Sequence, residues 1–252
     1  REEGVKGVIH GNRGRRCAWK LSEKAERKVI ELARGKYRGF NDHHLTEKLE
    51  EEGIKLSREK VRRVLRAQGI SSPRKRRAPK HRSRRVRREA EGMMVQIDGS
   101  PHDWLEGRGP RLCLVGAIDD ATSKVAAAFF EEQETSAAYF RLFLEIGRTQ
   151  GMALSAYADR HSIFWTDREP TVEEQLASKQ PKTQVGRALE ELGVTLIPAG
   201  SPQAKGRIER LWGTFQDRLV SEVRLAGARN KEEAQAVLEK FLPPYNRRFS
   251  KP

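Results

Sequence analysis

The order of strand-like and helix-like runs after residue 92 limits the fold of this chain more than any other feature. Three successive runs have the length and apolar content of β-strands, and turn residues 119–123 join the last two as a hairpin: 93–98, 111–118 and 124–130. Helical spacing then alternates with further strand-like runs, with helices over 135–150, 184–192, 203–220 and 232–242 and strands over 154–159 and 194–198. This order predicts an α/β domain, a mixed sheet of five strands with helices on both faces.

Residues 21–70 predict a separate, all-α domain of three short helices. Their expected N-terminal caps are Ser22, Asn41 or Asp42, and Ser57. In the third helix the apolar positions face inward, and the outside is crowded with basic residues, namely Arg58, Lys60, Arg62, Arg63 and Arg66. This distribution is typical of a recognition helix that lies in a major groove of DNA, although a solvated face of a plain three-helix bundle has a similar pattern.

The charge of the chain indicates a polyanionic partner. Lys and Arg number 50 against 35 Asp and Glu, a net charge of +15, which favours nucleic acid through steering and counterion release. Residues 71–90 hold ten basic residues and one acid, and Pro73 and Pro79 oppose a continuous helix. We therefore expect an extended linker over 71–91 whose predicted DNA contacts are Arg74, Lys75, Arg76, Arg77, Arg84 and Arg85.

Before the helices, residues 1–20 form a predicted basic arm. Glycines separate its arginines, and Arg13, Arg15 and Arg16 suit insertion into a narrow minor groove, although such runs are also found as plain linkers. The chain begins at Arg1 without an initiator Met. We therefore expect a fragment of a longer protein, with further DNA-binding elements on its N-terminal side.

Cysteine content and hydropathy exclude several classes of protein. Cys17 and Cys113 are too few for a disulfide framework or a four-ligand zinc site. No apolar run approaches the roughly 20 residues needed to span a bilayer. We expect a soluble cytoplasmic protein that is not associated with a membrane.

Three acidic residues stand where a carboxylate is not needed for folding. Asp98 and Asp159 end strand-like runs, where open α/β sheets present their chemistry, and Glu209 lies early in a helix-like stretch. Carboxylates gathered from distant segments repel one another unless cations lie between them. The pattern therefore predicts a divalent metal site with oxygen ligands, which is the equipment for phosphoryl transfer on nucleic acid.

Four motifs occur in a fixed order in the second half of the chain. They are IDGSPHDW at 97–104, IDDAT at 118–122, YADRHSIF at 157–164 and SPQAKGRIER at 201–210. With these motifs the chain resembles DDE transposases of the retroviral-integrase superfamily, and in particular bacterial insertion-sequence transposases of the ISNCY type. It departs from the retroviral enzymes in lacking a His/Cys zinc module and in the polar stretch 165–183 between Asp159 and Glu209.

The element order and the resemblance together imply a ribonuclease H-like catalytic domain over 92–225. A helix-turn-helix domain over 21–70 would precede it, and a helical extension over 226–252 would follow. By the resemblance, Asp98, Asp159 and Glu209 are the catalytic triad and hold two Mg²⁺ ions, for which Mn²⁺ can substitute, with Asp98 shared by both ions.

Other residues near the motifs have predicted supporting roles. Lys205 and Arg207 are expected to contact DNA. Candidates to contact and orient the triad carboxylates are His102, Asp103 and His161. A loop or core role is an equal alternative for His161. Asp119 and Asp120 are interpreted as turn residues. Trp104 and Trp165 are candidates to stack on a displaced base.

The resulting hypothesis is a transposase that acts on double-stranded DNA as a homo-oligomer, at least a dimer on paired ends. It would bind the terminal inverted repeats of its insertion sequence, cleave there, and join the 3′ ends to target DNA. A structure-selective nuclease of the same fold is one alternative, and the predicted helix-turn-helix argues against it. A domesticated, non-catalytic DNA-binding regulator is the other.

Overall fold

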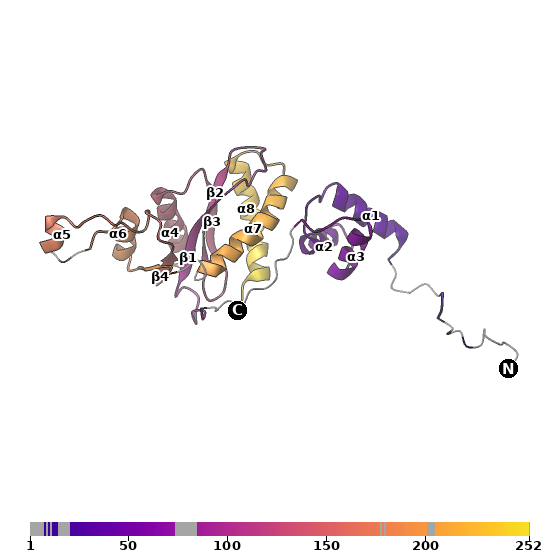
Figure 1. The fold of residues 1–252 in the computed structure, drawn as a ribbon, viewed down its shortest axis with the longest axis horizontal. Coiled ribbons are helices and arrows are strands. Elements are labelled where there is room, and N and C mark those ends of the chain that lie inside the picture. The colour runs from indigo at the N-terminus through magenta and orange to yellow at the C-terminus, as the bar shows by residue number, and fades with distance from the viewer. Residues whose placement is uncertain are drawn as a thin grey trace. The chain divides into compact units, whose positions relative to one another are not determined.

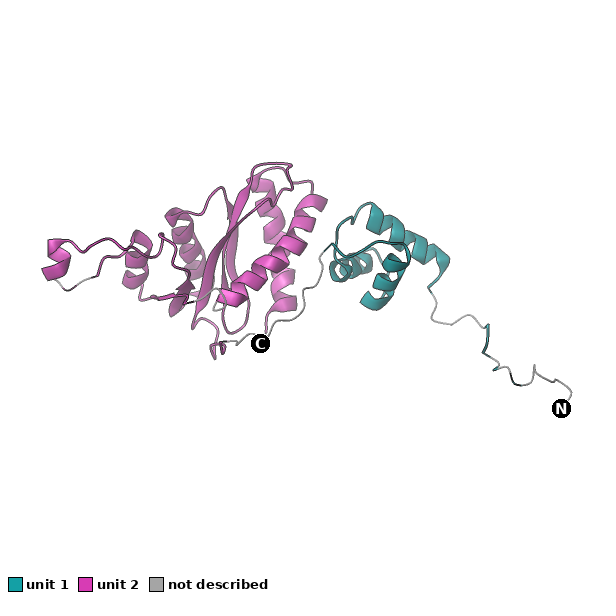
Figure 2. Cartoon of the chain, in the orientation of Figure 1, with its two compact units in different colours: residues 1–73 teal, residues 74–252 magenta. Residues whose placement is uncertain are grey.

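The computed structural model describes residues 8, 10, 12–14, 21–73, 85–176, 178, 180–200 and 205–251 (Figure 1). The chain divides into two compact units, unit 1 over residues 1–73 and unit 2 over residues 74–252 (Figure 2). Several predicted DNA contacts lie outside the described residues, namely Arg15, Arg16, Arg74, Lys75, Arg76, Arg77 and Arg84. Among the described residues, no helix is long and apolar enough to cross a membrane.

Unit 1 contains three helices, α1 (Glu23–Arg34), α2 (Asp42–Glu51) and α3 (Arg58–Ala67). Each begins at a side chain that accepts a hydrogen bond from a first-turn N–H group: Ser22 caps α1, Asn41 caps α2 and Ser57 caps α3. Such caps satisfy N–H groups that have no partner within the helix. The predicted helices and their caps are therefore present.

The three helices pack on a small apolar core. Val29, Leu49 and Val61, one from each helix, are completely buried. Arg62 and Arg63 project from α3 into solvent. Arg66 does not, because its guanidinium binds the Asp42 carboxylate at 2.6 Å and the Ile70 carbonyl oxygen at 2.7 Å. Arg66 thus joins α3 to α2 within unit 1.

Unit 2 is built on a five-stranded sheet in the order β3-β2-β1-β4-β5. The strands are β1 (Val95–His102), β2 (Leu112–Asp119), β3 (Val125–Glu131), β4 (Ser155–Ala158) and β5 (Thr195–Pro198). β1, β2 and β3 pair antiparallel, whereas β4 pairs parallel with both β1 and β5. The sheet is therefore mixed, with the strand order of the ribonuclease H-like architecture, as predicted.

Helices cover both faces of this sheet, as predicted (Figure 1). One face packs against α4 (Ser136–Gln150) and α6 (Gln184–Glu191). The other packs against α7 (Gly206–Leu225) and α8 (Lys231–Phe249). A short helix that the sequence did not predict, α5 (Val172–Leu176), lies in the polar stretch 165–183 and has no buried residue.

Strand β1 continues beyond the predicted end at Asp98 and reaches His102. Gly99, Ser100 and Pro101 are typical turn residues, but here they stay paired with β2. β4 pairs only with Val95 and Gln96, so the later part of β1 has one free side. A proline, which lacks an N–H group, is tolerated on such an edge. The prediction that the strand ends at Asp98 was therefore wrong.

Helix α8 continues to Phe249, although residues 232–242 were predicted as its extent. Pro243 and Pro244 lie inside it and remove backbone hydrogen bonds, at a cost of about 3 kcal/mol or more for an interior proline. Beyond them, Tyr245 is buried and packs edge-on against Phe215 of α7, with ring centroids 4.9 Å apart. Packing on the sheet therefore overrides the local signal to stop.

Side chains of α8 cover the outer edge of β3. Asn246 donates a hydrogen bond to the Val125 carbonyl oxygen at 3.0 Å and accepts one from the Val125 N–H at 2.9 Å. Gln235 accepts a hydrogen bond from the Phe130 N–H at 3.0 Å. These amides satisfy backbone groups that an edge strand otherwise leaves open.

Candidate active site

The register of two parallel strands brings Asp98 and Asp159 together. Gln96 of β1 lies beside Tyr157 of β4, and Asp98 and Asp159 each follow two residues further along their own segment. Neighbouring strands lie about 4.8 Å apart. Two acids that are far apart in the sequence thus meet where β4 ends, at the point in the sheet where a parallel pair adjoins an antiparallel one.

Lys205, the residue before α7, lies between these two carboxylates. Its Nζ atom is 2.7 Å from Asp98 Oδ1 and 3.3 Å from Asp159 Oδ2. The Lys205 side chain is only 7% exposed, whereas Asp159 is 48% exposed. One buried ammonium group therefore lies between two carboxylates and offsets the repulsion between them.

The second oxygen of Asp98 is bound from α7 as well. Trp212 donates its indole N–H to Asp98 Oδ2 at 3.0 Å. Trp212 approaches the sheet closely because Gly116, the β2 partner of Asp98, has no side chain. A Cβ atom at Gly116 would lie 2.9 Å from Trp212 Cη2. Sequence reasoning did not select Trp212 for the site, and its spacing of seven from Lys205, which places both on one helix face, was the available signal.

We expect Gly116→Ala to destabilise unit 2 by about 1–3 kcal/mol, because the added methyl group overpacks the contact between β2 and Trp212. Gly200→Ala is the matched control, since a Cβ atom there meets no heavy atom within 4 Å. Denaturant unfolding of both variants measures the difference. Equal unfolding free energies would show that the sheet accommodates the methyl group at Gly116.

Glu209 lies one helical turn beyond Lys205 in the first turn of α7 and is exposed. Residues four apart on a helix share a face, with Cβ atoms about 5–6 Å apart. Glu209 therefore projects on the side of α7 where Lys205 meets the aspartates. Among the described residues, however, no three His, Cys, Asp or Glu side chains are close enough to hold one metal ion.

Burial raises the pKa of Asp98 above its ordinary value, against the opposing charge and hydrogen bond of Lys205. The neighbouring charge of Asp159 raises the same pKa further. Loss of the Lys205 cation would leave Asp98 both buried and next to a like charge. A positive charge next to Asp98 therefore stabilises the ionised form of this carboxyl group.

The three residues predicted to support the triad have different positions. His102 lies four residues along β1 from Asp98, about 13 Å away at about 3.3 Å per residue, because the strand does not turn after Asp98. Asp103 follows it and accepts the Gly107 N–H at 3.0 Å within a turn. The structure does not bring these two to Asp98. His161 does lie at Asp159, where the backbone N–H of His161 donates to Asp159 Oδ1 at 3.2 Å.

The two candidate tryptophans also differ. Trp104 is completely buried and donates its indole N–H to the Ser100 carbonyl oxygen at 3.1 Å, so the prediction that it stacks on a base was wrong. Trp165 is partly buried, and its indole N–H donates to the Asp159 carbonyl oxygen at 2.8 Å. Trp165 is therefore next to the candidate site.

Two further predicted DNA contacts are engaged within unit 2. Arg207 binds the buried carboxylate of Asp120 with its Nη1 atom at 2.7 Å, and Arg85 binds the same carboxylate. Asp120 therefore does more than shape the hairpin turn, which was its interpretation from sequence. Its neighbour Asp119 does fit that interpretation, since it accepts the Thr122 N–H at 2.7 Å.

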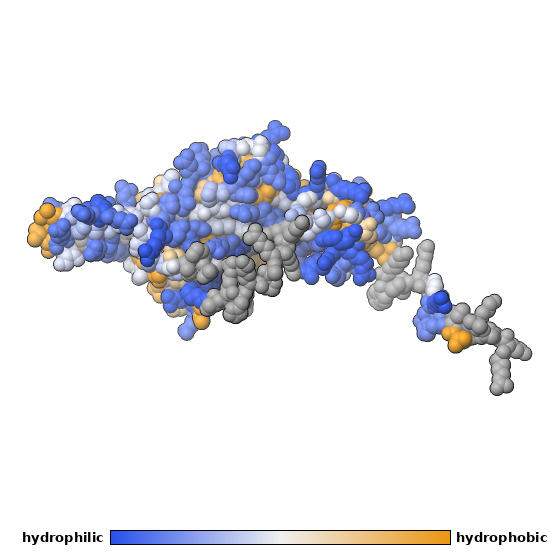
Figure 3. All heavy atoms as spheres, viewed as in Figure 1, coloured by the Kyte–Doolittle hydropathy of each residue, from blue (hydrophilic) through white to orange (hydrophobic). Residues whose placement is uncertain are grey.

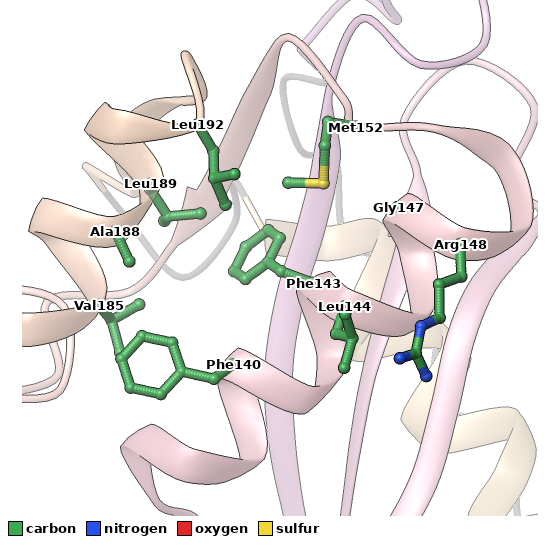
Figure 4. A pocket seen from close by; sticks show the side chains of 10 residues that line it. All are labelled: Phe140, Phe143, Leu144, Gly147, Arg148, Met152, Val185, Ala188, Leu189 and Leu192. Carbon is green, nitrogen blue, oxygen red and sulfur yellow. The ribbon is translucent and has the colours of Figure 1, made fainter.

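A pocket of about 310 Å³ lies between α4 and α6, away from the aspartates (Figure 4). Its lining is apolar apart from Arg148 and includes no carboxylate, so it does not suit chemistry on a phosphodiester. In the view of Figure 3, hydrophilic residues predominate on the visible face, and a small hydrophobic patch marks α5, where Val172 and Leu176 are exposed.

Fold and site together define a ribonuclease H-like domain with paired carboxylates beside the first turn of a helix, in a chain that also has a three-helix unit. No family model matches the chain. It is 36% identical over 248 residues to a putative transposase, y4bF, of Sinorhizobium fredii, and 30% identical over 286 positions to the transposase for insertion sequence IS1202 of Streptococcus pneumoniae. Each alignment covers 98% of this chain, which spans 53% of the first protein and 60% of the second.

Among solved structures, the chain is similar to the HTLV-2 integrase catalytic core domain in complex with magnesium. It is 15% identical, with a TM-score of 0.44, and the match covers 59% of this chain and 83% of that one. The predicted resemblance to transposases is confirmed by the two sequence relatives, which align with nearly the whole chain.

Proposed function

We propose that this chain is a DNA transposase that binds the terminal inverted repeats of its insertion sequence and catalyses metal-dependent cleavage and strand transfer. The observation that carries the proposal is the pair formed by Asp98 and Asp159, which share the Lys205 cation, with Glu209 one helical turn beyond Lys205 in α7. Transposase relatives that align with 98% of the chain support the same activity.

The donor set fits a hard divalent cation. Asp98, Asp159 and Glu209 offer carboxylate oxygens only, which Mg²⁺ and Mn²⁺ prefer. The position between two of these carboxylates already holds a positive charge, that of Lys205. Two Mg²⁺ ions, when bound, supply Lewis-acid activation of a water or 3′-hydroxyl and stabilisation of the leaving oxygen. Asp98 would be the shared ligand, and Trp212 would orient it.

In this proposal, Lys205 holds the place of a cation in the metal-free protein. We expect Lys205→Gln to lower the unfolding free energy by about 3 kcal/mol without metal, the low end for a broken buried ion pair because Asp159 is half exposed. Added Mg²⁺ should then stabilise the variant more than the wild type. Thermal unfolding with and without Mg²⁺ measures both effects.

Lys182→Gln is the control for this experiment, because Lys182 pairs with Glu190 at the surface, where such pairs contribute about 0–1 kcal/mol. It should change neither the stability nor the response to Mg²⁺ appreciably. Equal stabilisation of wild type and Lys205→Gln by Mg²⁺ would show that the ammonium group does not compete with the metal.

Unit 1 is the proposed element that reads the repeats. Arg58, Arg62 and Arg63 project from α3, which is held on a rigid core as a helix in a major groove must be. Lys60 is less exposed, and Arg66 has an intramolecular partner. Three more basic residues are proposed to contact the DNA backbone, namely Lys205, Arg207 and Arg85. Each of them also forms an ion pair with an aspartate in unit 2.

Because two transposon ends must be handled together, we propose that the protein acts as at least a dimer on paired ends, in the bacterial nucleoid.

The test of the proposed function uses duplexes that carry the inverted repeats flanking the gene. We expect specific binding, and 3′-end cleavage only with Mg²⁺ or Mn²⁺. Cleavage that ignores the repeat sequence would favour the nuclease, and binding without cleavage would favour the regulator.

A further inference from the structure

Asp120 is a completely buried carboxylate with four hydrogen-bond donors around it. Oδ1 accepts from the guanidinium groups of Arg85 and Arg207 and, at 2.9 Å, from Gln96 Nε2. Oδ2 accepts the backbone N–H of Arg88 at 2.9 Å. A buried charge is retained only where it is paired and hydrogen-bonded to this degree. None of these interactions belongs to the catalytic reaction as proposed above.

The hairpin turn does not need this carboxylate. Asp119 forms the side-chain contacts of the turn, because its Oδ1 accepts from both the N–H and the hydroxyl of Thr122, at 2.7 and 2.8 Å. Its Oδ2 accepts the Gly92 N–H at 3.0 Å. Two adjacent aspartates therefore have separate tasks, and that of Asp120 lies outside the hairpin.

That task is at the first turn of α7. The first N–H groups of a helix have no partner within it, and Lys205 at the start of α7 provides no side-chain cap. Gln96 of β1 replaces the cap, since its Oε1 accepts the Ile208 N–H at 3.3 Å. Gln96 can point this oxygen at the helix because Asp120 binds its Nε2. Asp120 also binds Arg207 directly, at 2.7 Å.

The Asp120 carboxylate also binds residues 85–88, near the C-terminal end of the linker. Arg85 and the backbone of Arg88 bind Asp120, and Arg87 donates to the Ala121 carbonyl oxygen at 2.6 Å and to Ser123 Oγ at 2.8 Å. The Arg85 side chain is 32% exposed and that of Arg207 only 10%. The chain that enters unit 2 and the first turn of α7 are thus bound to one buried charge.

We propose that Asp120 is a positioning residue for the reaction, which fixes the first turn of α7 on β1 through Arg207 and Gln96 and so sets the place of Glu209. The inference rests on the proposed function, in which Glu209 is a metal ligand. Asp120 touches neither metal nor DNA in this role. It acts through its contacts with Arg207 and, by way of Gln96, with Ile208, and these two residues directly precede Glu209.

The experiment compares Asp120→Asn with Asp119→Asn, which removes the neighbouring charge from the same turn. For Asp120→Asn we expect the dissociation constant for the repeat duplex to stay within about twofold. The cleavage rate at saturating DNA should fall by about 10- to 100-fold, the range for residues that orient metal ligands. Asp119→Asn should lower thermal stability and leave that rate near the wild-type value.

Amide hydrogen exchange in the metal-free protein is the second readout, and it does not depend on activity. Asp120→Asn should speed exchange of the Ile208 amide, whereas Asp119→Asn should not. Arg207→Gln is the variant to use if Asp120→Asn fails to fold, because it keeps the Asp120 pair with Arg85. Where Asp120→Asn does fold, the double variant of Arg207→Gln and Asp120→Asn should lower the cleavage rate no more than either substitution alone.

Unchanged exchange at Ile208 together with a wild-type cleavage rate in Asp120→Asn would overturn the inference. So would equal losses of rate in both aspartate variants, since these would reflect general destabilisation of the hairpin. A wild-type protein that cuts no DNA would instead overturn the proposed function, and the exchange data would still report whether Asp120 fixes α7.

Discussion

Replacing Asp98 or Asp159 with Asn, or Glu209 with Gln, is expected to reduce cleavage and strand transfer by more than about 100-fold, because removal of groups that merely orient metal ligands already costs 10–100-fold. Binding of the repeat duplex should stay nearly intact, since the DNA-reading surface proposed for α3 is in unit 1. Gel-based cleavage and binding assays on the same preparations measure both quantities.

Asp103→Asn is the matched control for the triad. Asp103 lies just beyond the end of β1, five residues after Asp98, in a turn where it accepts the Gly107 N–H. It should cleave at close to the wild-type rate. The metal requirement is tested in parallel with excess EDTA, which should stop the reaction. A Glu209→Gln protein that still cuts at the wild-type rate would refute the assignment.

The second large effect concerns sequence recognition. Replacing Arg62 and Arg63 with Ala is expected to reduce discrimination for the terminal repeat by about 1–3 kcal/mol for each arginine that reads a base, because these exposed side chains stand on a folded helix with a geometry suited to base edges. Binding titrations with repeat and scrambled duplexes measure the change. Arg66→Ala is the control, since it should destabilise unit 1 by removing the pair with Asp42.

The linker supplies the contrasting variant. Neutralising the run 74–77 should weaken binding to all DNA alike and flatten the salt dependence by about 0.9 of slope for each phosphate that is no longer neutralised. Arg85 and Arg87 are unsuitable for this test, because their guanidinium groups bind Asp120 and the carbonyl oxygen of Ala121, so their replacement would disturb unit 2. Loss of sequence preference in the linker variant, with preference kept in the helix variant, would reverse these roles.

The sequence predicted the parts of the fold that depend on local rules. Helix caps such as Ser22 and Ser57 were recognisable because a serine just before an apolar stripe at helical spacing can accept a hydrogen bond from a first-turn N–H group. Runs of apolar residues identified all five strands. Local rules failed for β1 and α8, where Pro101 lies on a free strand edge and Pro243 and Pro244 are held by the packing of Tyr245.

The candidate site was predictable in its residue types but not in its contacts. Asp98, Asp159 and Glu209 could be selected because each is an acid at the end of a strand-like run or the start of a helix. That Lys205 binds Asp98, and that Arg207 binds Asp120, depends on register between segments about a hundred residues apart. A charge in the sequence indicates that a partner is needed, but only the folded sheet decides which one.

The amide side chains of α8 have a consequence for how copies of this protein can join. Asn246 and Gln235 occupy backbone groups on the outer side of β3, so an incoming strand finds them already in use. The opposite border, β5, is four residues long and ends in Pro198, which has no N–H to offer. At these positions an incoming strand at β3 would have to displace the α8 amides, and one at β5 would find no hydrogen-bond donor at Pro198.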